Sequence, residues 1–150
     1  ETTHHASVCG DVMMSHTYVS GERRPIEVLV FEVDPSVVDE FLRVDHEVWT
    51  LGEALLPGCE RIPFLSKEVW LDDANPGRVT IVFVWESIDA WNKVGAPEIQ
   101  DRLQAEFDAR FPHALRLVAA PHEDSRQGIH RVSRFERLEP DHGVVGGTSS

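Results

Sequence analysis

The most constraining feature of this sequence is the order of its strand-forming and helix-forming segments. Runs rich in β-branched and aromatic residues alternate with amphipathic stretches. Strands are expected at 26–33, 66–71, 79–85, 115–119 and 129–135, and helices at 35–56, 87–91 and 97–110. Apart from the extra final strand, this is a β-α-β-β-α-β order. It predicts an α+β, ferredoxin-like fold, in which one antiparallel sheet carries its helices on one face.

Local signals place the ends of these elements. Asp34-Pro35 has the composition of a helix start, with Asp as the N-cap and Pro at the first helical position. Pro57-Gly58 ends the same helix. The 150 residues then divide into an N-terminal arm at 1–25, a folded domain at 26–138, and a Gly- and Ser-rich flexible tail at 139–150. Regular structure is expected to begin at Pro25.

The strand at 79–85 is apolar on both faces. Val79, Ile81, Phe83 and Trp85 alternate with Thr80, Val82 and Val84, so neither face is suited to water. Helices cover only one face of a ferredoxin-like sheet, and no second layer is encoded for the other. We therefore expect a second copy of the chain to cover it, forming a homodimer with a barrel-like cavity between or beneath the sheets.

The charge balance excludes several classes of partner. The chain has 14 Lys and Arg against 26 Asp and Glu, a net charge of −12. Such an acidic surface repels phosphate groups, so nucleic acid and anionic membranes are not expected partners. No apolar run approaches the roughly 18–20 residues of a membrane span. Phosphate-binding glycine loops, zinc-protease motifs and dinucleotide fingerprints are absent from the sequence.

Several short motifs together resemble one branch of the dimeric α/β-barrel superfamily. The motifs are Asp45-His46-Glu47-Val48-Trp49-Thr50, Pro57-Gly58, Lys67-Glu68-Val69-Trp70, and Phe83-Val84-Trp85-Glu86-Ser87 before Trp91. That superfamily includes antibiotic-biosynthesis-type monooxygenases, haem-degrading oxygenases and small polyketide cyclases. The similarity covers about residues 26–138 and implies a ferredoxin-like subunit that pairs into a dimeric α/β barrel. The branch carries no agreed activity, so the resemblance implies a fold and not a reaction.

One departure from the better-known members concerns cofactors. The cofactor-free monooxygenases and the haem-degrading members usually place a His on the helix after the third strand. Residues 88–111 of this chain contain no His. Haem ligation of that kind is therefore disfavoured, and no cofactor is expected.

The helix at 35–56 presents one acidic residue in an unexpected place. At 100° per residue, Asp45 lies inside the apolar arc, between Phe41 and Trp49. The apolar half also contains Val37, Val38, Leu42, Val44, Val48, Leu51, Gly52, Leu55 and Leu56, whereas Asp39, Glu40, Arg43, His46, Glu47, Thr50 and Glu53 fall on the polar half. A buried carboxylate must find a partner or remain protonated. Asp45 is therefore a candidate general acid or base, or else a structural carboxylate bonded to the backbone or to Lys67.

The remaining candidates surround Asp45. Lys67 would stabilise charge beside it, and Trp49, Trp70 and Trp85 would supply flat walls with one N–H donor each. His46 is a further candidate ligand contact, although its angle on the helix favours a solvated side chain.

The N-terminal arm carries soft and imidazole ligands. His4, His5, Cys9, Met13, Met14 and His16 lie within thirteen residues. They are weak candidates for copper, because no regular spacing organises them. Cys9 and Cys59 would instead form a disulfide if the chain is exported. The first sixteen residues resemble neither a common tag nor a helix, and on this basis we slightly favour export over a cytoplasmic location.

Two classes of function remain open at this point. One is a cofactor-independent monooxygenase, cyclase or isomerase that acts on a small apolar aromatic or polyketide-like molecule. The other is a non-catalytic protein that binds a ligand or copper. The state of Asp45 discriminates between them, because a catalytic carboxylate should face a cavity of at least about 300 Å³ with one oxygen free.

Overall fold

The computed structural model describes the backbone of residues 2–9, 12–121 and 128–139, and the side chains of residues 15–121 and 128–139. The chain divides into two compact units. The central unit is Arg24–His130, and the terminal unit combines Glu1–Arg23 with Arg131–Ser150. The predicted tail lies outside the described residues, except for residue 139.

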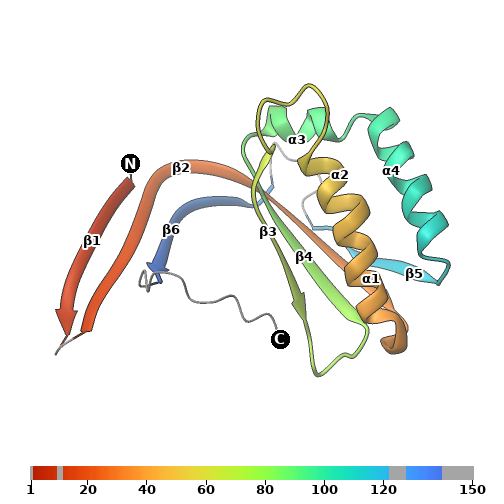
Figure 1. Ribbon diagram of the computed structural model, residues 1–150, viewed down its shortest axis with the longest axis horizontal. Helices are drawn as coiled ribbons and strands as arrows, with labels where there is room; N and C mark the ends of the chain where they lie inside the picture. Colours follow the sequence, from red (N-terminus) through yellow and green to blue (C-terminus); the bar gives the residue numbers. More distant parts are fainter. Residues whose placement is uncertain (1, 10–11, 122–127, 140–150) are drawn as a thin grey trace, which may run out of the picture. The chain divides into compact units, whose positions relative to one another are not determined.

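The central unit has the predicted ferredoxin-like topology. Its strands are the second half of β2 (Val12–Val33), β3 (Phe64–Leu71), β4 (Arg78–Trp85) and β5 (Leu115–Ala119). They pair antiparallel in the order β3-β4-β2-β5. Two helical segments, from residue 35 to residue 54 and from residue 88 to residue 110, form one layer on one face of this sheet (Figure 1). The sequence therefore predicted the fold class of this unit correctly.

The first helical run is continuous but changes its winding. It consists of the 3₁₀ turn η1 (Pro35–Val37), α1 (Val38–Val44), the π-helix η2 (Asp45–Thr50) and α2 (Leu51–Ala54). As predicted, Asp34 caps the start, because its Oδ1 accepts a hydrogen bond of 2.9 Å from the backbone N–H of Ser36. The second helical segment is α3 (Ile88–Val94), capped by Ser87, followed by α4 (Pro97–Arg110).

Apolar side chains between the helices and the sheet form the core. An edge-to-face contact joins Phe41 of α1 to Phe107 of α4, with ring centroids 6.0 Å apart. On the sheet, Phe83 and Trp85 stack at 5.2 Å, and Trp91 of α3 stacks on Trp85 at 5.8 Å. These aromatic contacts fix the helical layer against β4.

The prediction that regular structure begins at Pro25 is wrong. β2 starts at Val12, and its first half pairs antiparallel with β1 (Thr2–Cys9), from Cys9 opposite Val12 to Thr2 opposite Val19. β6 (His130–Leu138) also pairs with β2. Pro25 instead lies just before Ile26, where pairing with β4 begins. Proline has no N–H to donate, so a position between two sets of ladder partners suits it.

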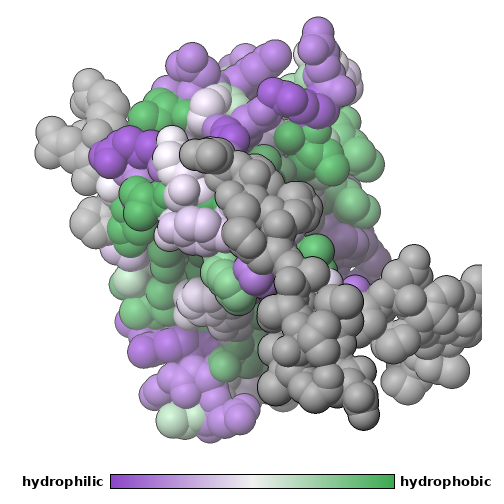
Figure 2. Space-filling model, turned by 90° about the vertical axis from the view of Figure 1, so that its left-hand side faces the viewer, coloured by the Kyte–Doolittle hydropathy of each residue, from purple (hydrophilic) through white to green (hydrophobic). Residues whose placement is uncertain are grey.

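In the terminal unit, Arg131 and Glu22 form an ion pair at 3.3 Å, and the ring of His16 stacks on Phe135 at 4.6 Å. Large apolar side chains remain exposed in both units, for example Trp70 and Phe135. Figure 2 shows residues of high hydropathy, in green, among hydrophilic ones on the side of the molecule that faces the viewer.

Candidate functional site

A cavity of about 390 Å³ lies in the central unit, between the helical layer and the sheet. Its floor is the inner face of β2 and β4, and its walls come from the first helical run, α4 and β5. The apolar lining consists of Leu29, Phe31, Phe41, Trp49, Ile81, Phe83, Phe107, Leu115 and Leu117. The polar lining consists of Glu27, Asp45, Glu53, Gln100 and Gln104. The volume and the mixed lining are typical of a site for a small organic molecule.

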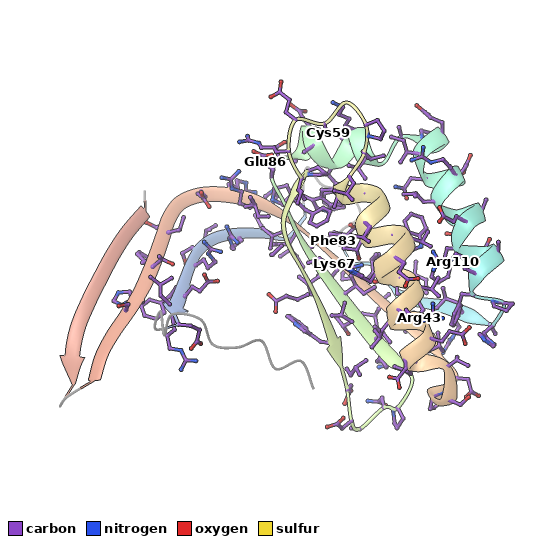
Figure 3. All side chains as sticks on the ribbon, viewed as in Figure 1. Arg43, Cys59, Lys67, Phe83, Glu86 and Arg110 are labelled. Atoms are coloured by element: carbon purple, nitrogen blue, oxygen red, sulfur yellow. The ribbon has the colours of Figure 1, made fainter. Side chains whose placement is uncertain are left out.

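Asp45 lines this cavity and forms a buried ion pair with Lys67. The Lys67 ammonium donates to Oδ2 of Asp45 at 2.6 Å and also to the Thr50 hydroxyl. The same ammonium lies 5.1 Å from the centre of the Phe83 ring, and Figure 3 shows these two side chains next to each other. Oδ1 of Asp45 accepts no hydrogen bond from the described side chains. Burial raises the pKa of Asp45 above its ordinary value, and the charge and hydrogen bond of Lys67 oppose that rise.

The π-helix determines which residues of the helical run face the cavity. The backbone N–H of Leu51 bonds to the carbonyl of His46, five residues earlier. Such bonds give more residues per turn than the 3.6 of an α-helix, so each residue turns through less than 100°. The difference accumulates over six residues, and it aligns Asp45, Trp49 and Glu53 along one line facing the cavity.

This change of winding corrects two expectations from the helical angle. Glu53, placed on the polar half by a regular 100° step, is 7% exposed and lines the cavity. Leu55, placed on the apolar half, is 68% exposed. Both errors have the same cause, because every residue after Asp45 lies further back around the axis than an α-helix would put it.

Glu53 is a site residue that the sequence analysis did not find. Its Oε2 accepts a hydrogen bond of 3.3 Å from Nε2 of Gln100, and that amide also donates to the carbonyl of Val94 at 3.0 Å. Burial, and then the nearby charge of Glu27, raise the pKa of Glu53 from 4.5 to about 7. The sequence offered one signal for Glu53, which was its four-residue spacing from Trp49. In a regular α-helix Glu53 still falls on the polar half, so this spacing did not identify it as a site residue.

The predicted tryptophans occupy different environments. Trp49 lines the cavity. Trp85 is buried in the core and contacts two cavity-lining residues: it stacks on Phe83, and its indole N–H donates a hydrogen bond of 3.1 Å to Oε1 of Glu27. Trp70 is 51% exposed, and its indole bonds to Glu68 outside the cavity. His46 is exposed on the outer side of the π-helix. The structure thus brings together Asp45, Lys67 and Trp49, and places Trp70 and His46 elsewhere.

Most of the arm candidates lie outside the described side chains. The side chains of His4, His5 and Cys9 lie outside those described, as do those of Met13 and Met14. Cys59 is a half-buried free thiol, and its pairing with Cys9 stays a prediction. Among the described side chains, no group of three or more His, Cys, Asp or Glu residues is arranged to hold a metal ion.

Within the described part of the chain, none of the helices combines the length and the apolar character that crossing a bilayer requires.

The strand order and the layered helices define the central unit as an α+β, ferredoxin-like domain. A comparison with solved structures finds proteins that are similar to this chain. One, from Caulobacter crescentus CB15, is provisionally assigned as an antibiotic biosynthesis monooxygenase; it is 18% identical, with 63% of this chain and 86% of that chain covered and a TM-score of 0.44. A second antibiotic biosynthesis monooxygenase is 20% identical, with coverages of 62% and 93% and a TM-score of 0.38. A protein from Agrobacterium tumefaciens is 12% identical, with coverages of 77% and 91% and a TM-score of 0.36.

No protein-family model matches the chain, and no curated protein sequence matches it.

Proposed function

We propose that the central unit binds a small, largely apolar molecule in its cavity and catalyses a proton transfer on it without a cofactor. Proton transfer to or from carbon or oxygen is the central step of an isomerisation or a cyclisation. The observation that carries the proposal is the position of Asp45, which faces a cavity of about 390 Å³ with one carboxylate oxygen available to a ligand.

The cavity lining supports the apolar character of the ligand. Phe31, Phe41, Phe83 and Phe107 offer ring faces and edges, and Trp49 adds an indole wall. The acidic groups Glu27, Asp45 and Glu53 line the same space, whereas none of the lining residues is basic. These groups would repel a ligand with a negative charge, and the aromatic rings that form most of the lining favour a ligand without a charge.

Asp45 would act as the acid or base, and Lys67 would stabilise its charge. The Lys67 side chain is 6% exposed and that of Asp45 is 8% exposed, so their interaction is shielded from water. A carboxylate held in this way points in one direction and exchanges its proton with what occupies the cavity. Trp49, four residues further along the helical run, would form the wall against which the ligand packs.

Binding without turnover is the second candidate function. It is favoured by one observation, the occupation of Asp45 Oδ2 by Lys67, because a carboxylate engaged in an ion pair can be purely structural. Copper binding by His4, His5, Cys9 and His16 remains a separate proposal for the arm.

We also propose that the protein is a homodimer joined through the sheet face opposite the cavity. Residues on this face alternate with the cavity-lining residues of β2 and β4. The face carries Ile26, Val28 and Val30 from β2, Val82 and Val84 from β4, and Trp70 from β3. In the described central unit the helices cover only the other face (Figure 1). Val84 is already buried, and a second copy of the same sheet would remove the other side chains from water.

The ligand-binding proposal can be tested with 1-naphthol, a neutral bicyclic aromatic, by quenching of tryptophan fluorescence. Leu117 lines the cavity and is 49% exposed, so Leu117→Trp should fill the entrance and weaken binding at least about tenfold. Ile62 is also 49% exposed but lies outside the cavity, so Ile62→Trp is the matched control. Equal binding by both variants would contradict the cavity as the ligand site.

A further inference from the structure

Two carboxylates on one helical run face the same cavity. Asp45 begins the π-helix, and Glu53 lies eight residues later in α2, with Trp49 midway between them. Both residues are nearly inaccessible to solvent, since Asp45 as a whole is 5% exposed and Glu53 is 7% exposed. Among the side chains that the structure describes, a cation bonds to Asp45 and none bonds to Glu53.

Glu53 is held in place by a neutral group. The Gln100 amide donates one hydrogen bond to Oε2 of Glu53 and a second to the Val94 carbonyl at the end of α3. Because both bonds use Nε2, the amide is fixed from two sides, and it presents its donor to Glu53 without neutralising it. Oε1 of Glu53 accepts no hydrogen bond within the described part of the chain.

The charged groups that act on Glu53 come from β2, η2 and β3, and α4 contributes the neutral Gln100. Glu27 on β2 and Asp45 on η2 are acidic and disfavour a negative charge on Glu53, whereas Lys67 on β3 favours it. The Lys67 ammonium bonds directly to Asp45, so its effect on Glu53 is smaller than the effects of burial and Glu27. Glu53 consequently changes its protonation state near neutral pH, which is the range where a general acid or base works best.

We propose that Glu53 is a second proton-transfer residue of this cavity, and that Gln100 is its positioning residue. The ligand class would be a neutral carbonyl compound with an acidic C–H next to its carbonyl group. This inference rests on the proposed function, because it assumes that proton transfer occurs in the cavity.

The step balances without any co-reactant. The Glu53 carboxylate takes the proton from the ligand carbon, so that a C–H bond breaks and an O–H bond forms on Glu53. The electron pair of the C–H bond moves into the adjacent carbonyl and produces an enolate. Return of the proton to the same or to a conjugated carbon regenerates the carboxylate and leaves either the starting compound or its isomer.

The experiment uses the full chain and 2-tetralone, a neutral bicyclic ketone, in D₂O. Deuterium incorporation next to the carbonyl is followed by mass spectrometry, and binding is measured separately by fluorescence. The wild-type protein should accelerate incorporation above the buffer rate, and Glu53→Gln should lose about a hundredfold or more of that acceleration while still binding the ketone. Glu47→Gln removes an exposed carboxylate of the same helical run outside the cavity, so it should behave as wild type.

The pH dependence of the rate distinguishes a positioning role of Gln100 from a purely structural one. The wild-type rate should rise with an ionisation near pH 7, and Gln100→Met should move that ionisation to higher pH, because the lost hydrogen bond favours the ionised form of Glu53. An unchanged profile in Gln100→Met would overturn its positioning role.

The possible negative results of this experiment can be distinguished from one another. Acceleration that is equal in wild type and Glu53→Gln would overturn the role of Glu53 and leave the proposed function standing. Binding of 2-tetralone without acceleration by wild type would overturn the catalytic part of the proposed function, and Glu53 with it. Absence of both binding and acceleration would contradict the ligand class.

Discussion

Nζ of Lys67 lies 2.6 Å from Oδ2 of Asp45, and both side chains are more than nine-tenths buried. The two residues come from β3 and from the start of the π-helix, so the ion pair joins the edge of the sheet to the helical layer beside the cavity. Removing charged groups from water costs free energy that only close pairing offsets. The pair therefore fixes the position of Asp45, and the consequences of breaking it can be measured.

Breaking this ion pair from either side should destabilise the fold. Asp45→Asn leaves the Lys67 ammonium buried without its counter-charge, and Lys67→Met does the same to Asp45. We expect each variant to lower the free energy of unfolding by about 3–5 kcal/mol, and the double variant to recover most of the loss. Urea unfolding measures all three.

The surface ion pair of Arg43 and Glu47 is a matched control for these variants. Both side chains are well exposed, and Figure 3 shows Arg43 beside α1 and Arg110 beside α4. Arg43→Met should change the free energy of unfolding by less than about 1 kcal/mol. The double variant could instead lose as much free energy of unfolding as the two single variants together. That result would contradict a direct interaction between Asp45 and Lys67.

The stability of the protein should fall as pH rises through the titration range of Glu53. Its pKa is 4.5 when unfolded and about 7 in the fold, so the folded state binds more protons between these values. The stability is fully present below about pH 4.5 and is lost progressively up to about pH 7. Asp45, whose pKa is also raised, acts in the same direction.

Glu53→Gln isolates the contribution of Glu53, because the variant keeps the shape and removes the titration. We expect wild type and variant to have similar free energies of unfolding at pH 4.5, and the variant to be more stable by about 3 kcal/mol at pH 8. Denaturant unfolding across this range checks the difference. A gap that does not change with pH would show that Glu53 has an ordinary pKa.

Two glycines with similar backbone angles should respond differently to alanine. Gly58 and Gly77 have φ values of 85° and 93°, where a side chain is strained. A Cβ on Gly58 meets nothing within 4 Å, whereas a Cβ on Gly77 would overlap the carbonyl oxygen of Val33. We expect Gly58→Ala to cost about 1 kcal/mol and Gly77→Ala roughly 3 kcal/mol or more, measured by thermal unfolding. Equal costs would show that the turn before β4 moves to accommodate the new Cβ, and would contradict the predicted overlap with Val33.

Light scattering at micromolar concentration should give the mass of a dimer. Val28→Arg places a charge among Ile26, Val30 and Val82 on the sheet face opposite the cavity, and it should shift the protein to monomer. Ile62→Arg, at an exposed loop position, should leave the dimer intact. A monomeric wild type would refute the homodimer.

Much of the central unit could be predicted from local patterns. β-branched runs, the cap at Asp34 and the proline at position 97 located the strands and helices to within a few residues. The burial of Asp45 could also be predicted, because it sits between Phe41 and Trp49 before the winding changes. A backbone group and Lys67 were the two partners considered for a structural Asp45, and the hydrogen bond to Lys67 is present.

The sequence by itself thus determined the order of the elements and the fold class, since both follow from propensities that act over a few residues. Only the tertiary structure decided that Glu53 faces the cavity, because the π-helix rotates every later residue away from the regular α-helical angle. It also placed Glu27 on β2 and Gln100 on α4 beside Glu53, although they are 26 and 47 residues away in the chain. Such positions depend on how sheet and helices pack, and no periodicity along the chain encodes that packing.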